Sequence, residues 1–318
     1  MWRRYLRPLI LILTCAHAAP TVAEQYPMKP IRVIVQAGAG SAVDVIPRVV
    51  FDQLSAQLGQ PIIVENRAGA GGTIATAAVA KSDPDGYTIL ATSSAHTVAP
   101  WMHANLPFDT AQDLSAIIAI GSLPTVLVTS PAKGPKTIQE FIAAAKAKPG
   151  SFNYTSTGVG SATHFSAERF RASAGIAAVH IPMKGGPEAL TEVMAGRVEF
   201  YFCPIGTALP YVREGKLLAL VLNGEKRADA LPDVPTTQEA GLADANYVFW
   251  VGLFAPSKTP RDIIERLHQE TAKAIAIVHE KLAILGVTPM AMTAAEFDAY
   301  VKDEIARNEI LVKAADIK

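Results

Sequence analysis

Short apolar runs alternate with longer amphipathic stretches through most of the chain. The first run, Ile31–Val35, is rich in β-branched residues and contains one arginine, which is typical of a buried strand. Apolar residues at four-residue spacing then predict a helix, namely Ile46, Val50, Leu54 and Leu58. Because such pairs of segments recur along the sequence, it predicts an α/β protein with parallel sheets and helices on both faces.

The same reading predicts further elements along the chain. Strands are expected over residues 61–65, 87–91, 117–120, 125–129, 153–155, 179–181, 198–202, 217–222 and 248–255. Helices are expected over residues 73–80, 138–147, 165–173, 188–195, 261–277 and 294–315. Thr137 and Glu140 have the spacing of a capping box for the second of these helices.

The turn after the first strand decides where the first helix begins. Ser41 and Asp44 have the S-x-x-D spacing of a helix N-terminus. A helix beginning at Ser41 would carry Pro47 at its sixth position, where proline costs about 3 kcal/mol. With Asp44 as the N-cap, Pro47 falls at the third position, where its missing N–H is no loss. We therefore expect Asp44 to cap the helix and the Ser41 hydroxyl to stay free for a ligand.

Four loops that follow expected strands consist of small residues with many hydrogen-bond donors. They are residues 37–41, 66–72, 92–96 and 156–164. In open α/β sheets, loops at the carboxyl ends of strands converge on the ligand. Hydroxyl groups and N–H groups at a helix N-terminus can hold carboxylate oxygens without a full opposing charge. These loops predict a site for a small organic anion.

Composition and charge narrow the class of protein. The 318 residues suffice for two domains, and 50% hydrophobic content with 18% charged residues suits globular cores. Basic and acidic residues number 29 each, which gives no reason to expect nucleic acid or an anionic membrane as a partner. The only cysteines are Cys15 and Cys203, so we expect no disulfide in the exported protein.

Residues 1–23 are typical of a secretory signal peptide. Three arginines precede a short apolar core, and cleavage sites fit at residues 16–18 and 21–23. The apolar core is too short to span a bilayer. We expect cleavage of this segment and a mature protein in the periplasm.

Motifs for catalysis or cofactor binding are missing from the sequence. It has no G-x-S-x-G, no H-E-x-x-H and no P-loop lysine, and Val43 stands where a dinucleotide fingerprint needs its third glycine. No cluster of ligating residues has metal-site spacing. Ser161 and His164 are better explained by loop capping than by catalysis. We expect no enzyme, no cofactor and no metal, with a secreted serine hydrolase as an alternative.

Short motifs from about Tyr26 to the C-terminus resemble the substrate-binding receptors of tripartite tricarboxylate transporters, the Bug family. The resemblance is specific only when the motifs are taken together. They are Tyr26-Pro27-x-Lys29-Pro30-Ile31, Val64-Glu65-Asn66-Arg67-x-Gly69-Ala70-Gly71-Gly72, Pro84-Asp85-Gly86-Tyr87-Thr88, Leu106-Pro107-Phe108-Asp109, Lys148-Pro149-Gly150-x-x-Asn153-Tyr154 and Leu231-Pro232-Asp233-Val234-Pro235-Thr236-x-x-Glu239-Ala240-Gly241.

This resemblance implies a type II periplasmic-binding-protein fold, with two α/β domains, a hinge, and the ligand cleft between them. Domain 1 would comprise residues 24–124 and 252–318, and domain 2 residues 125–251. The family holds a carboxylate through its first βα loop and through donors of the second domain. Carried over by position, the ligand-binding residues would be Gly38, Gly40, Ser41, Asn66, Ser93, Ser94, Ser156, Thr157, Ser161 and Cys203.

Departures from the family pattern affect the expected ligand. Gln36-Ala37 replace Pro-Phe, and Cys203-Pro204 replace the Asp-Asn pair of members that resemble amino-acid receptors. Without that acid, a ligand ammonium group has no partner. The resemblance thus implies a monomeric receptor for a dicarboxylate or aromatic acid, serving two integral-membrane transporter subunits. A binding protein that signals to a membrane kinase is the alternative.

Overall fold

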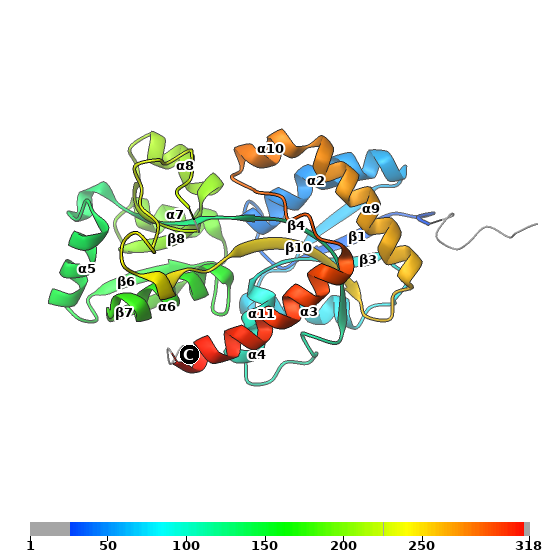
Figure 1. The fold of residues 1–318 in the computed structure, drawn as a ribbon, viewed down its shortest axis with the longest axis horizontal. Coiled ribbons are helices and arrows are strands. Elements are labelled where there is room, and N and C mark those ends of the chain that lie inside the picture. Colours follow the sequence, from blue (N-terminus) through cyan, green and yellow to red (C-terminus); the bar gives the residue numbers. More distant parts are fainter. Residues whose placement is uncertain (1–25, 225, 315–318) are drawn as a thin grey trace, which may run out of the picture.

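The computed structural model describes residues 26–224 and 226–314, so the expected signal peptide lies outside the described residues. Two five-stranded sheets stand side by side (Figure 1), in the orders β2-β1-β3-β10-β4 and β7-β6-β8-β5-β9. The first comprises β1 (Ile31–Val35), β2 (Ile62–Asn66), β3 (Thr88–Ser93), β4 (Leu114–Leu123) and β10 (Phe249–Pro256). The second comprises β5 (Thr125–Thr129), β6 (Phe152–Ser156), β7 (Ala178–Pro182), β8 (Phe200–Pro204) and β9 (Leu218–Asn223).

Each sheet with its helices is called a lobe here. The first lobe holds α2 (Ala42–Leu58), α3 (Thr73–Ala80), α4 (Ala95–Met102), α9 (Arg261–Ile277), α10 (His279–Ile284) and α11 (Ala294–Ala314). The second lobe holds α5 (Ile138–Ala147), α6 (Ala162–Ala174), α7 (Gly186–Met194) and α8 (Ile205–Arg213). Short 3₁₀ turns cover Ala70–Gly72, Pro131–Lys133 and Ala243–Ala245. Helices α4, α8 and α10 were not among the expected elements.

The side chains of β1 point alternately into two apolar cores, which explains why helices cover both faces of the first sheet. Val33 and Val35 pack in one core with Val50 of α2, whereas Ile34 packs in another with Phe297 of α11. Strand side chains point alternately to the two faces, and here both faces are apolar. The predicted α/β fold with helices on both faces is confirmed.

Two connections join the lobes. The chain passes from β4 to β5 at Pro124 and returns through residues 246–248 into β10. β10 is antiparallel to β3 and β4, and β5 is antiparallel to β8 and β9. The expectation of parallel sheets was wrong for these strands. β5 and β10 each begin just after the chain has crossed from the other lobe. They therefore start at the edge of the sheet where the neighbouring strands end, and run in the opposite direction. The predicted limits of the two domains stay a prediction.

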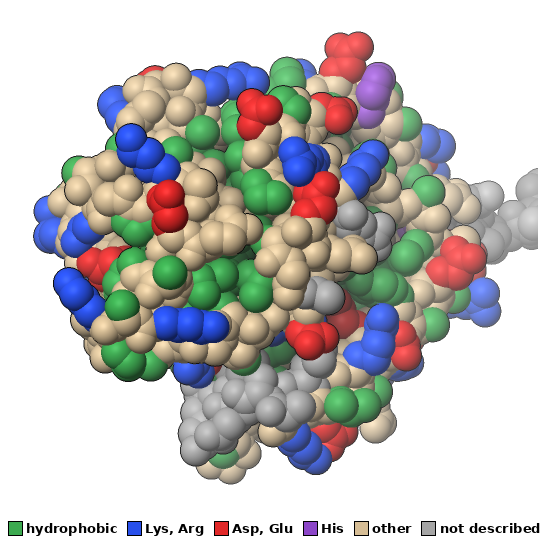
Figure 2. Space-filling model, turned by 60° about the vertical axis from the view of Figure 1, so that its left-hand side comes forward, with side chains coloured by type: hydrophobic (Ala, Val, Ile, Leu, Met, Phe, Trp, Pro, Cys, Tyr) green, Lys and Arg blue, Asp and Glu red, His purple; other side chains and the backbone are tan. Residues whose placement is uncertain are grey.

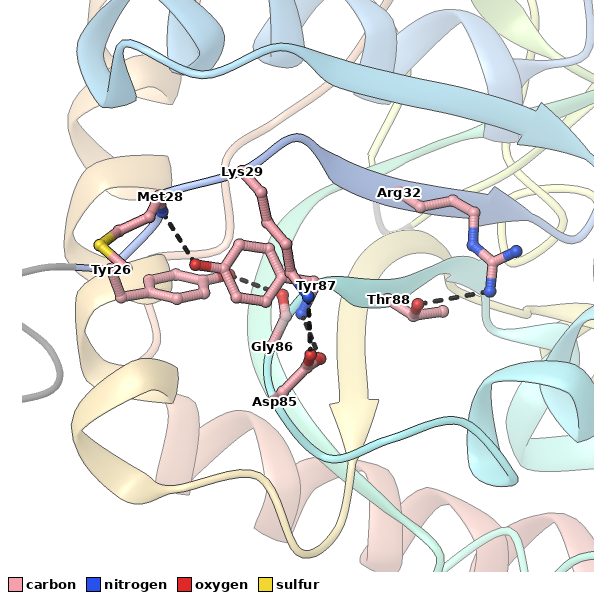
Figure 3. Close-up of polar contacts among 8 residues, drawn as sticks. All are labelled: Tyr26, Met28, Lys29, Arg32, Asp85, Gly86, Tyr87 and Thr88. Atoms are coloured by element: carbon pink, nitrogen blue, oxygen red, sulfur yellow. Dashed lines mark hydrogen bonds and ion pairs between the residues drawn. The ribbon is translucent and has the colours of Figure 1, made fainter.

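Two motifs that carry the family resemblance pack against each other in the first lobe (Figure 3). The Tyr26 hydroxyl donates to the Gly86 carbonyl at 2.6 Å, and the Met28 N–H donates to the Tyr87 hydroxyl at 2.8 Å. Gly86 has φ +78°, and a Cβ there would lie 2.5 Å from Cγ2 of Ile263. These motifs precede β1 and β3, so they anchor the strands at the edge opposite their carboxyl ends.

The surface carries charges of both signs. On the face shown in Figure 2, acidic and basic side chains are interspersed, with hydrophobic groups between them. Among the residues that the structure describes, no helix is long and apolar enough to cross a membrane. Within the same residues, no group of three or more potential metal ligands gathers in one place.

Candidate functional site

A cleft of about 560 Å³, its opening included, lies between the lobes at the carboxyl ends of β1, β6 and β8. Its walls are built from small and hydroxyl-bearing residues, and no lining residue carries a charged side chain. The lining residues are Gln36, Ala37, Ser41, Ala42, Val43, Ala68, Gly69, Gly71, Gly72, Ser93, Thr157, Ser161, Ala162, Thr163, Gly186, Tyr201, Pro204, Thr207 and Phe249.

The structure brings four of the ten predicted ligand-binding residues onto the cleft wall. They are Ser41 and Ser93 from the first lobe, and Thr157 and Ser161 from the second. The other six lie next to this wall or behind it: Gly38, Gly40, Asn66, Ser94, Ser156 and Cys203. Their contacts are described below.

Helix α2 begins at Ala42, with Ser41 and not Asp44 as its N-cap. The expectation of an Asp44 cap was therefore wrong. Pro47 stands at the sixth helical position, and the helix continues through it to Leu58. Asp44 is instead the third helical residue, and its carboxylate accepts the Gly40 N–H at 2.9 Å. This bond ties the first turn of α2 to the loop before it.

The Ser41 hydroxyl is free, as expected, although for a different reason. Ser41 has the extended backbone of an N-cap (φ −74°, ψ 161°), but its side chain makes no capping bond. The residue is 5% exposed and lines the cleft, and Oγ has no hydrogen-bond partner among the described residues. Ala42 and Val43, which follow it, also line the cleft, and first-turn N–H groups have no acceptor within a helix. We call this set of donors the cradle.

Asn66 holds the cradle in shape. Its Nδ2 donates to the Ala37 carbonyl at 3.0 Å and to the Asp44 carboxylate at 2.9 Å, while Arg48 donates to its Oδ1 at 3.0 Å. Arg48 Nε also donates to Asp44 at 2.7 Å. Burial by itself would raise the pKa of Asp44, but the bonds from Asn66, Gly40 and Arg48 outweigh it and lower that pKa. The carboxylate therefore stays charged and occupied with the loop.

Gln36 was not among the expected ligand-binding residues. It lies directly after β1, is 7% exposed and lines the cleft. Its Nε2 donates to the Ser93 hydroxyl at 2.7 Å, and its Oε1 accepts a bond from the Thr92 hydroxyl. A Cβ on Gly72 would lie 2.4 Å from Oε1, so the glycine makes room for this side chain. The replacement of an apolar family residue by glutamine was the available signal.

The second-lobe loop is bonded to itself through Thr163. The Thr163 hydroxyl accepts the Thr157 N–H at 3.0 Å and contacts the hydroxyls of Thr157 and Ser161 at 3.2 and 3.1 Å. Ser161 caps α6 by accepting the His164 N–H at 3.2 Å. This confirms the capping interpretation of Ser161 and His164. The loop presents hydroxyls whose positions are set before a ligand arrives.

Ser156 faces inward, under this loop. It is fully buried, its hydroxyl lies 2.7 Å from Nε2 of His180, and it accepts the Gly158 N–H at 3.1 Å. The His180 ring stacks on His164 at 4.0 Å, and Nδ1 of His164 accepts the Gly160 N–H at 3.3 Å. Burial lowers the pKa of His164 to about 4 and that of His180 to about 3, so both rings are neutral near pH 7.

Cys203 and Ser94 are core residues. Cys203 is fully buried among apolar side chains of the second lobe, which raises the pKa of its thiol, and the next residue, Pro204, reaches the cleft instead. Ser94 is fully buried, with its N–H donated to the Trp250 carbonyl at 3.1 Å. The thiol therefore behaves as a small hydrophobic group, and Ser94 as a link between β3 and β10.

Glycines allow the lobes to meet across the cleft. A Cβ on Gly71 would lie 2.7 Å from the Val159 carbonyl oxygen, and one on Gly38 would lie 2.9 Å from that of Lys184. Both contacts join a first-lobe loop to a second-lobe loop. The lobes are thus in a closed arrangement, and backbone packs on backbone at the cleft edge.

Two α/β lobes, two crossing connections and an uncharged cleft at the carboxyl ends of the strands define a solute-binding protein of the type II fold. The sequence family described as "Tripartite tricarboxylate transporter family receptor" matches residues 46–317. The chain belongs to this family of solute-binding receptors.

Relatives and solved structures agree with this assignment. Protein BugT of Bordetella pertussis is 35% identical over 302 residues, which cover 94% of this chain and 93% of BugT. MatC of Rhodopseudomonas palustris, solved with bound malate, is 29% identical with a TM-score of 0.86, over 90% of this chain and 100% of MatC. An R. palustris protein solved with adipate is 26% identical with a TM-score of 0.86, over 92% of this chain and 98% of that protein.

Proposed function

We propose that this receptor works in the periplasm, where it captures a small organic carboxylate without an amino group and delivers it to the membrane subunits of a tripartite transporter. The observation that carries the proposal is the Ser41 hydroxyl, buried, unpartnered and placed at the start of α2 on the cleft wall. The helix N-terminus favours negative charge at this point.

The composition of the cleft wall supports a carboxylate over an amino acid. Hydroxyl and N–H groups satisfy a carboxylate, whereas an ammonium group needs an acid or several acceptors. The lining residues include neither Asp nor Glu, and Asp44 is already bonded to Gly40, Asn66 and Arg48. The relatives solved with malate and adipate hold dicarboxylates, which is the class that we favour here, with an aromatic acid as the second choice.

A thermal-shift panel of organic acids on the purified protein tests the ligand class, because a ligand that binds the folded state raises apparent stability. The informative pairs share a carbon skeleton and differ in the amino group, such as succinate against aspartate and glutarate against glutamate. We expect succinate or glutarate, which lack the amino group, to stabilise the protein, and aspartate and glutamate not to. A larger shift with aspartate or glutamate than with the matched diacid would overturn the ligand assignment.

Delivery to a transporter needs a separate test in cells. Deletion of the gene should abolish uptake of the radiolabelled ligand found in the panel, and a plasmid copy should restore it. The Gly71→Ala variant, which obstructs lobe contact, should restore little. Normal uptake with lost induction of ligand-responsive genes would indicate the sensor role instead.

A hydrolase role has no support from the buried serines. Ser156 is the serine closest to an imidazole, at 2.7 Å from His180, but it is fully buried and absent from the cleft wall. The His164 ring bonds Gly160 and not the Ser161 hydroxyl. An ester panel should therefore show no turnover that depends on Ser161.

A further inference from the structure

His103 lies where the two lobes touch, and it is not one of the cleft-lining residues. It is the C-cap of α4 in the first lobe, with its N–H donated to the Ala99 carbonyl at 3.1 Å. Gly160 belongs to the second-lobe loop, and a Cβ there would lie 2.6 Å from Nε2 of His103. A Cβ on Gly71 would lie 2.8 Å from the Gly160 carbonyl carbon. The first lobe thus contacts this glycine twice, through an imidazole ring and through a backbone turn.

The contact with Gly160 covers one ring nitrogen of His103. The residue as a whole is half-buried, but Nε2 is inaccessible and has no hydrogen-bond partner among the described residues. A neutral imidazole needs a hydrogen on only one nitrogen, whereas an imidazolium carries one on each. In this arrangement the N–H of a charged ring at Nε2 would be buried without an acceptor, which costs free energy.

The titratable groups around the end of α4 are engaged elsewhere. Helices α6 and α11 pack against α4, and their buried titratable groups, each with a hydrogen-bond partner, are His164, Glu168 and Glu304. Arg169 of α6 donates to a backbone carbonyl at 2.6 Å. In the loop after His103, Asp109 and Asp113 accept backbone N–H groups of that loop. Burial lowers the pKa of His103, and none of these groups offsets it.

We propose that His103 makes closure of the lobes sensitive to protons: the neutral imidazole fits against Gly160, whereas the imidazolium favours the open arrangement. Opening moves Gly160 away, so both ring nitrogens can then reach water. A proton therefore binds the open state better, whereas the cleft ligand binds the closed state better, and each weakens binding of the other. This inference rests on the proposed function, because closure over a carboxylate is what the proton opposes.

The pH window follows from the two states of the ring. In the open state His103 titrates near the ordinary imidazole pKa of about 6.5. In the closed state burial lowers that pKa. Well above pH 6.5 the ring is neutral in both states, so the receptor has its full affinity. As the pH falls below about 6.5, the open state takes up a proton that closure must remove, and the affinity falls.

Calorimetry with succinate at pH 8 and pH 5.5 tests the inference. On acidification the wild type should lose about three- to tenfold more affinity than His103→Gln, whose side chain stays neutral. Protonation of succinate and of the other histidines acts on both proteins alike, so the comparison isolates His103. His279→Gln removes an exposed histidine of α10 and should keep the wild-type loss. Melting temperatures confirm that both variants fold. Equal losses in wild type and His103→Gln would overturn the inference.

Proton release gives a second readout, which a loss of packing would not change. Calorimetry in buffers of different ionisation enthalpy counts the protons released when succinate binds. At pH 6.5 about half of the open-state rings are charged, so the wild type should release up to about half a proton more than His103→Gln. Equal proton counts would contradict the assignment. If aspartate binds better than succinate, the proposed ligand class is wrong, and aspartate then serves as the probe in the same comparison. The two failures are therefore distinguishable.

Discussion

Among the helices that begin at the cleft, α2 of the first lobe and α6 of the second lobe both have serine as the N-cap. The backbone angles of Ser41 (φ −74°, ψ 161°) and Ser161 (φ −69°, ψ 159°) are nearly the same. Yet Ser161 accepts the His164 N–H and contacts Thr163, whereas Ser41 Oγ has no partner among the described residues. Equal local geometry thus gives two outcomes: the Ser161 hydroxyl is bonded within its loop, and the Ser41 hydroxyl has no partner on the cleft wall.

The residues around each cap also differ. In α2, the Asp44 N–H donates to the Ser41 carbonyl, and the Asp44 carboxylate takes the Gly40 N–H. The loop is therefore held without the serine hydroxyl. In α6 no acid follows the cap, and Ser161 itself must satisfy a first-turn N–H. An acid at the third helical position does not by itself free the capping hydroxyl, because Thr137 still caps α5 although Glu140 stands there.

The largest effect is expected where the two lobes touch. Gly71→Ala places a Cβ 2.7 Å from the Val159 carbonyl oxygen at φ +63°. Overpacking between the lobes costs about 1–3 kcal/mol in the closed state only, so the affinity for the cleft ligand should fall about 10- to 100-fold in calorimetry. Gly59→Ala is the matched control, with φ +64° and nothing within 4 Å of the added Cβ. Equal losses of affinity in both variants would show that lobe contact is not the cause.

The serine pair should separate binding from stability. Ser41→Ala should weaken carboxylate binding by about 1.5–3 kcal/mol, because a hydrogen bond to a charged group is lost, while stability changes little. Ser161→Ala should lower the free energy of unfolding by about 1 kcal/mol, because a working N-cap is lost. Calorimetry and urea unfolding measure the two quantities. Unchanged affinity in Ser41→Ala would remove this hydroxyl from the site.

Asp44→Asn tests the carboxylate that holds the loop before α2. We expect a loss of about 1–2 kcal/mol in the free energy of unfolding at pH 7, because bonds to a charged carboxylate weaken. Since the folded-state pKa of Asp44 is lowered, its contribution is present above about pH 4, the unfolded value, and is lost as the pH falls through the folded value. The difference between wild type and variant should therefore shrink at the lowest pH. A difference that stays constant from pH 7 to pH 3 would contradict the assignment.

The smallest effect at neutral pH concerns the stacked histidines. Burial depresses both pKa values, so neutral rings stabilise the fold above about pH 6.5, and this stabilisation is lost as the pH falls from 6.5 toward 4. His180→Gln removes one of the two groups and keeps a partner for Ser156. The slope of unfolding free energy against pH in this window should fall, by less than about 1.4 kcal/mol per pH unit. An unchanged slope would show that His180 does not titrate there.

Much of the fold could be predicted from the sequence, because its elements depend on local patterns. The predicted bounds of Ile31–Val35, Thr125–Thr129 and Arg261–Ile277 agree with β1, β5 and α9. The Thr137 cap with Glu140 at the third helical position is also observed, at 3.2 Å. The antiparallel direction of β5 and β10 was missed because it depends on how the chain crosses between lobes, which no local pattern records.

The sequence predicted where the candidate site lies better than it predicted which residues line it. The loops do converge, and Ser41, Ser93, Thr157 and Ser161 line one cleft. Whether these residues contact a ligand stays a prediction. Ser156 is turned toward His180, a residue distant in sequence, and Gln36 was passed over although it lies on the wall.

By itself, the sequence determined the order of the strands and of most helices, the family, and the supply of small residues and hydroxyls after the strands. These depend on periodicity and residue type, which act over a few neighbours. Only the tertiary structure decided which hydroxyls point into the cleft and which bond within a loop. That choice depends on partners far along the chain, such as Asn66 for the first cradle and His180 for the second loop, and these are brought near only by folding.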